Sequence, residues 1–244
     1  LQTAGIIHHM SLDAVVDAAS RRIERFEPSQ QVVAFEASER TAGDSCRDPI
    51  HRLRVLEGQL LDAGCVRRLR ESFGGPLGCS HLLTLAQLMV SMFPGVLDRE
   101  LESEAVRKYG RQAGERLFKR VIFIDGFERS DGDMEVAIQL TDIQTAPFAG
   151  MHGILDRFAS QHEVRVLAKV DIASMNLSLF DAAERIRARS ELGEKVWQSR
   201  RELLAPFVGH PVMHGLAPEL LRRLGSDPAH QTLLEALLNF APGL

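Results

Sequence analysis

The sequence is poor in the features that mark several protein classes. Its 244 residues include only three cysteines, Cys46, Cys65 and Cys79, which is too few for a disulfide-stapled scaffold and favours a reducing, cytoplasmic location. Aromatic residues make up 6%, and acidic residues outnumber basic ones to give a net charge of −4. Nucleic-acid binding is therefore not expected, because it needs a basic face and stacking side chains.

Long hydrophobic runs are missing as well. The nearest one, residues 82–97, is interrupted by Thr84, Gln87, Ser91 and Pro94. We therefore expect neither a membrane-spanning segment nor a signal peptide. With 45% hydrophobic and 25% charged residues, the chain can bury a sizeable core in one large domain or in two smaller ones.

Familiar catalytic motifs are absent too. There is no Gly-x-Gly-x-x-Gly, Walker, His-Glu-x-x-His or Gly-x-Ser-x-Gly pattern, which argues against nucleotide, metalloprotease and esterase chemistry. A zinc site built from His8 or His9 with Cys46, Cys79 and His81 is chemically reasonable, but no Cys-x-x-Cys pair supports it. We expect neither a metal nor another cofactor.

What the sequence does contain is an internal repeat. Four short segments of the first half recur in the same order about 150 residues later. The matched segments are 16–20 with 170–174, 35–40 with 180–185, 57–75 with 208–226, and His81 with His230. We therefore predict a tandem duplication, with repeat one, N-terminally incomplete, over residues 1–98, a charged linker helix over 99–117, and a complete repeat two over 118–244.

Periodicity predicts the elements. Alternating polar and apolar residues indicate strands at 10–16 and 164–170, and an Asp-Gly turn between two apolar runs indicates a hairpin over 121–140. Helices are expected at 49–59, 65–72, 80–92, 182–204, 217–224 and 228–240. The predicted fold class is α+β, with antiparallel sheets packed against helices and two pseudo-equivalent repeats in one compact unit.

The order of these motifs resembles a known bacterial family. "IHHM" before a strand, Cys46, and the block Gly78-Cys79-Ser80-His81-Leu82 are similar to the domain of unknown function 2889, whose block is approximately Gly-Cys-Thr-His-Leu. Repeat two is similar to the family's earlier pattern at Arg129, Asp131, Gly132 and Asp142, but it has no counterpart of Cys46 or Cys79. The resemblance implies no activity, although members occur in bacteria that degrade aromatic and lipid-like compounds.

The block around Cys79 is the first candidate site. If Ser80 caps a helix, free N–H groups of the first turn face this position. His81 then suits a general base, and Cys79 suits a nucleophile because a helix N-terminus lowers a thiol pKa. The alternatives are a core histidine, on an inward stripe with Leu85, and a cysteine that acts as a small hydrophobic residue.

Further candidates lie outside this block. His162 aligns with His8 in the repeat, so both are expected to line equivalent pockets, with His162 catalytic and His8 binding substrate. Arg129 and Asp142 are candidate partners of a polar substrate group, and His152 lies on a Gly-rich stretch that suits a lid. The alternative for these residues is a surface salt bridge and a plain loop.

These observations favour an enzyme without a cofactor. We expect an acid-base lyase that acts on a small apolar or aromatic metabolite such as a lignin-derived compound, by elimination or by retro-aldol C–C cleavage, including loss of formaldehyde. The alternative is a non-catalytic small-molecule-binding or scaffold protein. In either case the expected partner is a small-molecule ligand, not a nucleic acid or a membrane, and a homodimer is left open.

Overall fold

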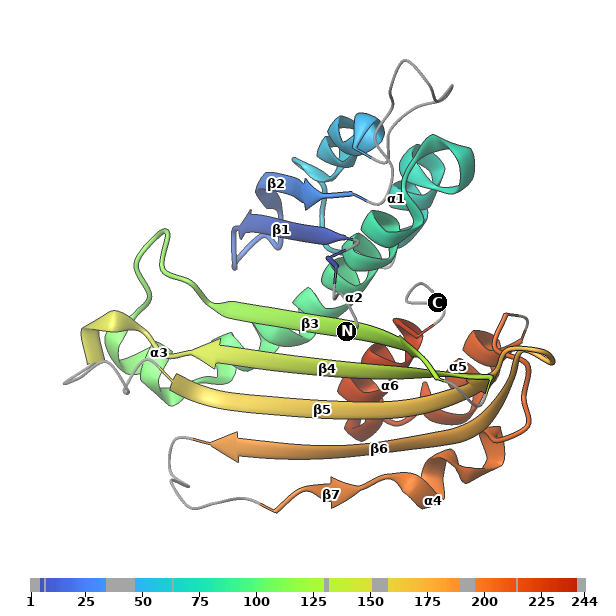
Figure 1. The fold of residues 1–244 in the computed structure, drawn as a ribbon. Coiled ribbons are helices and arrows are strands. Elements are labelled where there is room, and N and C mark those ends of the chain that lie inside the picture. Colours follow the sequence, from blue (N-terminus) through green and yellow to red (C-terminus); the bar gives the residue numbers. More distant parts are fainter. Residues whose placement is uncertain are drawn as a thin grey trace. The chain divides into compact units, whose positions relative to one another are not determined.

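The computed structural model describes residues 5–6, 8–33, 47–62, 64–129, 132–150, 158–188, 196–213 and 215–240. The chain divides into two compact units, Leu1–Glu102 (unit 1) and Ser103–Leu244 (unit 2). Each unit has antiparallel strands followed by helices, and in unit 2 one short helix also precedes the strands (Figure 1). The predicted α+β class with antiparallel sheets is confirmed.

Unit 1 is a strand hairpin followed by helices. Its elements are β1 (His9–Val16), β2 (Ile23–Val32), the 3-10 helix η1 (Asp48–Leu56), α1 (Cys65–Phe73), the 3-10 turn η2 (Gly75–Leu77) and α2 (Ser80–Glu102). Met10 pairs with Gln30, and Ala14 pairs with Phe26. Opposite residues of an antiparallel pair share one face, and on this face Phe26 and Gln30 are buried.

The helices of unit 1 follow from apolar residues at helical spacing. In α1, Cys65 and Phe73 are buried on one side. In α2, Leu82 and Ala86 are fully buried, one position along from the predicted inward stripe, whose first residue His81 is only partly buried. By length and hydropathy alone, α2 could cross a membrane. This is weak evidence, because the core helices of soluble proteins pass the same test, and 33% of the most apolar window of α2 is buried.

Unit 2 is a five-stranded antiparallel sheet with helices on one face (Figure 1). Its elements are α3 (Glu104–Tyr109), β3 (Phe118–Glu128), β4 (Asp133–Thr145), the 3-10 turn η3 (Phe148–Gly150), β5 (Phe158–Asp171), β6 (Asn176–Ala188), β7 (Gln198–Ser199), α4 (Arg201–Leu204), the 3-10 turn η5 (Ala205–Phe207), α5 (Leu216–Leu224), the 3-10 turn η6 (Pro228–His230) and α6 (Gln231–Leu238). The strands are arranged in chain order, β3 to β7. The predicted hairpin and the strand over 164–170 are therefore confirmed.

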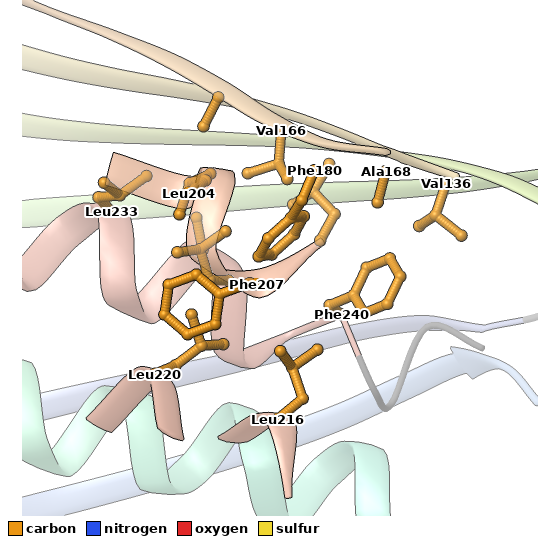
Figure 2. Close-up of a cluster of buried hydrophobic side chains, with 14 of the residues drawn as sticks. Val136, Val166, Ala168, Phe180, Leu204, Phe207, Leu216, Leu220, Leu233 and Phe240 are labelled. Atoms are coloured by element: carbon orange, nitrogen blue, oxygen red, sulfur yellow. The ribbon is translucent and has the colours of Figure 1, made fainter. Parts of the chain in front are cut away.

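The core of unit 2 lies between this sheet and the C-terminal helices (Figure 2). Every second residue of β4, β5 and β6 points into it, as the period of a half-buried strand requires. Phe180 lies at its centre, with its ring centroid 6.2 Å from that of Phe207 and 5.9 Å from that of Phe240. Each such buried ring contributes about 1.5–3 kcal/mol relative to exposure.

The predicted linker helix over 99–117 is wrong. α2 ends at Glu102, and Ser103, in an extended conformation, caps the short helix α3 by accepting a hydrogen bond from the Val106 N–H. Gly110 and Gly114 then adopt positive φ values of 70° and 84°, which end the helix because other residues enter this region only at a cost. The segment turns into β3.

The predicted helix over 182–204 is also wrong. Alanine, glutamate and arginine favour a helix there, yet the segment forms β6, β7 and the single turn α4. Phe180, Ala182 and Glu184 alternate into the core while their neighbours point outward, and β6 pairs along its length with β5. Burial on a sheet therefore outweighs the local helical preference.

One backbone arrangement occurs in both units. The Gly58 N–H donates to the Ile23 carbonyl at 2.7 Å in unit 1, and the Gly209 N–H donates to the Leu177 carbonyl at 2.8 Å in unit 2. Both glycines have positive φ values, 76° and 88°. Each of these hydrogen bonds joins the start of the second strand of a hairpin to the loop before a helix.

The two units correspond closely in order but not in every predicted pairing. α2 begins at Ser80 and α6 at Gln231, so alignment by helix start places Cys79, rather than His81, opposite His230. The predicted match of 35–40 lies outside the described residues. The duplication itself stays a prediction.

Candidate functional site

The first candidate site is the unit 1 cluster of His8, Cys79 and His81. His8 immediately precedes β1, while Cys79 and His81 flank the first residue of α2. The His8 and His81 rings are 4.2 Å apart between centroids and inclined at 40°. The Cys79 Sγ lies 3.9 Å from the His81 Nδ1, within contact distance for a thiol and an imidazole. A strand start and a helix start thus bring three titratable groups together.

Glycine at position 78 is necessary for this geometry. A Cβ atom on Gly78 would lie 2.4 Å from the Phe73 carbonyl oxygen and 2.6 Å from the Phe73 ring. Contacts this short force a shift of the backbone, so only glycine allows the chain to pass Phe73 and present Cys79 to His81.

The electrostatics of the cluster favour reactive forms near neutral pH. Burial raises the pKa of the Cys79 thiol, but the hydrogen bond from His81, those from the Leu82 and His81 N–H groups and the charge on His81 outweigh it and lower the pKa to about 7. Burial and the nearby charge of His81 lower the pKa of His8, which favours its neutral imidazole. The cluster therefore holds a neutral base beside a partly ionised thiol.

The second candidate site is a buried ionic network in unit 2. Arg120 of β3, Asp142 of β4 and His162 of β5 lie directly opposite one another across three strands. Arg120 binds both Asp142 carboxylate oxygens at 2.6 Å and contacts Glu235 of α6 at 2.5 Å. The polar groups thus form a ladder on the face of the sheet that also carries the core.

The ladder continues on the other side of His162. The His162 Nε2 donates to Glu184 at 3.0 Å, and Arg200 donates to the other oxygen of the same carboxylate at 2.6 Å. Burial raises the pKa of Glu184, but the hydrogen bonds from His162 and Arg200 and their charges lower it below its usual range. We name the six residues Arg120, Asp142, His162, Glu184, Arg200 and Glu235 the unit 2 network.

The predicted site residues therefore fall into separate groups. His8, Cys79 and His81 come together in unit 1, whereas His162 and Asp142 belong to the unit 2 network. Arg129 is partly exposed in the β3–β4 turn and contacts Glu135 at 3.3 Å, the surface salt bridge that was the alternative. His152 lies outside the described residues. Among the described residues, no three His, Cys, Asp or Glu side chains are placed to hold a metal ion.

Sequence reasoning missed several buried polar residues. Gln30 lies in unit 1 on the buried face of β2, two residues past Pro28 and four past Phe26. Glu184 has the same place in β6, four residues past Phe180. The strand pattern could have identified both residues, because a polar residue at a position where the pattern expects an apolar one is buried and needs a hydrogen-bond partner.

Comparison with known proteins gives one positive finding. No curated protein and no solved structure matches the chain significantly. A family model matches residues 1–93, which contain the unit 1 cluster; its description is "Protein of unknown function (DUF2889)". The similarity to this family is therefore shown for residues 1–93.

Proposed function

We propose that the unit 1 cluster catalyses proton transfer in a cofactor-independent lyase reaction. The observation that carries this proposal is the contact of the His8 ring with the His81 ring, with the Cys79 thiol at 3.9 Å from His81. A neutral imidazole beside a second imidazole and an acidic thiol supplies both a proton acceptor and a proton donor near neutral pH. Such a pair is what an elimination or a retro-aldol reaction needs.

In the retro-aldol case, the neutral His8 accepts the proton of a substrate hydroxyl group. The oxygen forms a carbonyl as the adjacent C–C bond breaks, and an aldehyde leaves; when the hydroxyl is primary, the aldehyde is formaldehyde. The electron pair of the broken bond stays on the other carbon, where a carbonyl or another electron-withdrawing group of the substrate has to delocalise it. That carbon then takes a proton from the imidazolium or the Cys79 thiol. Proton and electron pair are thus balanced without an added oxidant.

The surroundings of the cluster support a substrate class. β1 continues from His8 into a face whose residues include Leu12, Ala14 and the buried Phe26. An apolar face beside convergent polar groups is typical of small-molecule sites. We propose a small, mostly apolar or aromatic hydroxylated metabolite, such as a lignin-derived diol.

The test is an assay for released aldehyde with the full chain and a panel of aromatic diols. His8→Ala and His81→Ala should lower turnover by about 10²–10⁴, the usual contribution of a positioned acid or base. His51→Ala, an exposed histidine of η1, is the matched control and should keep full activity. Turnover that survives both cluster substitutions, or none with any diol, would contradict the proposal.

The alternative, a non-catalytic binding or scaffold role, is favoured for unit 2 by one observation. His162, which we had expected to be catalytic, is held between Glu184 and the strand opposite, and Glu184 is also bound by Arg200. Groups already paired in this way more often fix a fold than transfer protons. His162→Ala should therefore affect turnover only as far as it affects stability.

A further inference from the structure

Gln30 is a buried amide whose hydrogen bonds are unmade. Its side chain is 5% exposed, and within the described part of the chain neither its Nε2 nor its Oε1 has a hydrogen-bond partner. The Nδ1 of His8 is buried and unpartnered in the same sense. A polar group left unpaired in this way costs about 1–3 kcal/mol, so an amide with both ends unpaired points to a role other than stability.

The register of the hairpin places Gln30 beside the unit 1 cluster. Gln30 lies directly opposite Met10, two residues from His8. Cβ atoms of directly opposite residues are about 5 Å apart and diagonal ones about 7–8 Å, a span that long side chains cover. The amide therefore lies at the same end of the hairpin as the His8 and His81 rings.

Unit 2 shows what this position does when its polar groups are paired. Val164 lies opposite Glu184 just as Met10 lies opposite Gln30, and His162 precedes Val164 by two residues. There the histidine and the carboxylate bind each other at 3.0 Å. In unit 1 an amide replaces the carboxylate, and a register shift between His9 and Met10 interrupts the strand. The histidine and the carboxylate are thus hydrogen-bonded to each other in unit 2, whereas the amide of Gln30 and the Nδ1 of His8 have no hydrogen-bond partner among the described residues of unit 1.

The chemistry of an amide selects the ligand. Its NH₂ group needs an acceptor and its oxygen needs a donor, so a carboxylate, which only accepts, or an ammonium, which only donates, would leave one end unpaired. Arg47 donates to the main-chain carbonyls of Gln30 and Gln31. The group that fits is uncharged and carries both a donor and an acceptor.

We propose that Gln30 and His8 bind an uncharged group of a small-molecule ligand, a hydroxyl or a carboxamide, and hold it next to the Cys79 thiol. This inference deepens the function proposed above, because it names the substrate group that the site recognises. It rests on that proposal for the location of the site, but not on turnover.

The test compares two alkylating reagents on Cys79 of the full chain. Iodoacetamide carries a carboxamide and iodoacetate a carboxylate; in both reactions the thiolate attacks the CH₂ carbon, the S–C bond forms and iodide leaves. Rates for Cys79 are measured by peptide mass spectrometry, and their ratio is divided by the ratio for glutathione. Gln30→Met, which keeps the volume and removes both polar atoms, should lower this corrected ratio about tenfold, the value of one hydrogen bond of about 1.4 kcal/mol.

A second measurement separates binding from structure. Removing an unpartnered buried amide should raise the melting temperature of Gln30→Met by about 2–6 °C. Gln31→Met is the matched control, because this neighbour is exposed and its amide binds Ser29. The Gln31→Met variant should leave the corrected ratio unchanged and should not raise the melting temperature.

Each outcome decides the inference. An equal loss of both rates, an unchanged ratio or a fall in melting temperature in Gln30→Met would show that the amide serves only the fold. No reaction of Cys79 with either reagent in the folded protein would show that nothing reaches the site. Because the assay does not use turnover, failure of the lyase proposal alone would leave these rates as predicted.

Discussion

At the scale of single residues, the same side chain has different chemistry in the two units. His8 has no hydrogen-bond partner at Nδ1 among the described residues and a pKa lowered by burial, whereas His162 is bound to Glu184. Gln30 lies opposite Met10 in unit 1, whereas Glu184 lies opposite Val164 in unit 2. Reactivity is therefore expected in unit 1.

The pH dependence of Cys79 alkylation measures its partnership with His81. A lowered pKa means more thiolate at a given pH, so the iodoacetamide rate of the wild-type protein should rise with a midpoint near pH 7. In His81→Ala the midpoint should move up towards the ordinary thiol value of about 8.5, and the rate at pH 7 should fall roughly tenfold. A midpoint that does not move would contradict the assigned contact. Cys65, whose pKa is raised by burial, is the internal control and should remain unreactive.

The unit 2 network predicts unequal costs for two arginine substitutions. Arg120→Ala removes the cation that both the Asp142 and the Glu235 carboxylates bind in the core, and should lower the free energy of unfolding by about 3–5 kcal/mol. Arg129→Ala breaks the partly exposed pair with Glu135 and should cost less than about 1 kcal/mol. Urea unfolding of both variants checks the contrast. Equal costs would show that the network does not stabilise the core.

At the scale of elements, the start of α2 depends on a single glycine. Gly78→Ala puts a Cβ atom 2.4 Å from the Phe73 carbonyl oxygen, so the turn must move, at about 1–3 kcal/mol. The Cys79 thiol then leaves its position beside His81, and its pKa should rise towards the ordinary value. Gly126→Ala in β3 is the control, since its Cβ would meet nothing within 4 Å and should change stability little. Chemical unfolding and the alkylation profile together decide the prediction.

Element prediction succeeded at several positions where local rules act, and it failed once because of long-range burial and once because a local signal was overlooked. The start of the last helical segment was recognisable because Asp227 accepts the Ala229 N–H and Pro228 follows it. The 182–204 segment was not, because its residues favour a helix and only the core around Phe180 makes it a strand. The prediction of a single linker helix failed because a local signal was overlooked, namely the helix cap at Ser103 and the later glycines Gly110 and Gly114.

At the scale of the whole molecule, the two units are expected to unfold separately. Unit 2 has a core of its own between sheet and helices, so a fragment of residues 103–244 should fold. Its circular dichroism should melt cooperatively, and Trp197, the one tryptophan of the chain, reports on its sheet because its ring lies under Arg165 at 4.4 Å. Phe180→Ala in this fragment should cost about 3–5 kcal/mol. A fragment that melts without cooperativity would mean that unit 2 depends on unit 1.

The strands at 10–16 and 164–170, the Asp-Gly turn and the helix starts near residues 65, 80 and 217 were readable from residue order, because each depends on neighbours within a few positions. The local order of residues also identified Cys79 and His81 as neighbours at a helix start. The predicted resemblance of the sequence to the DUF2889 family is confirmed over residues 1–93. Only the tertiary structure brought His8 to His81 and turned Gln30 into a buried, unpaired amide. These contacts join segments far apart in the chain. A strand pattern can place Gln30 on a buried face, but only the packing decides which groups lie beside it.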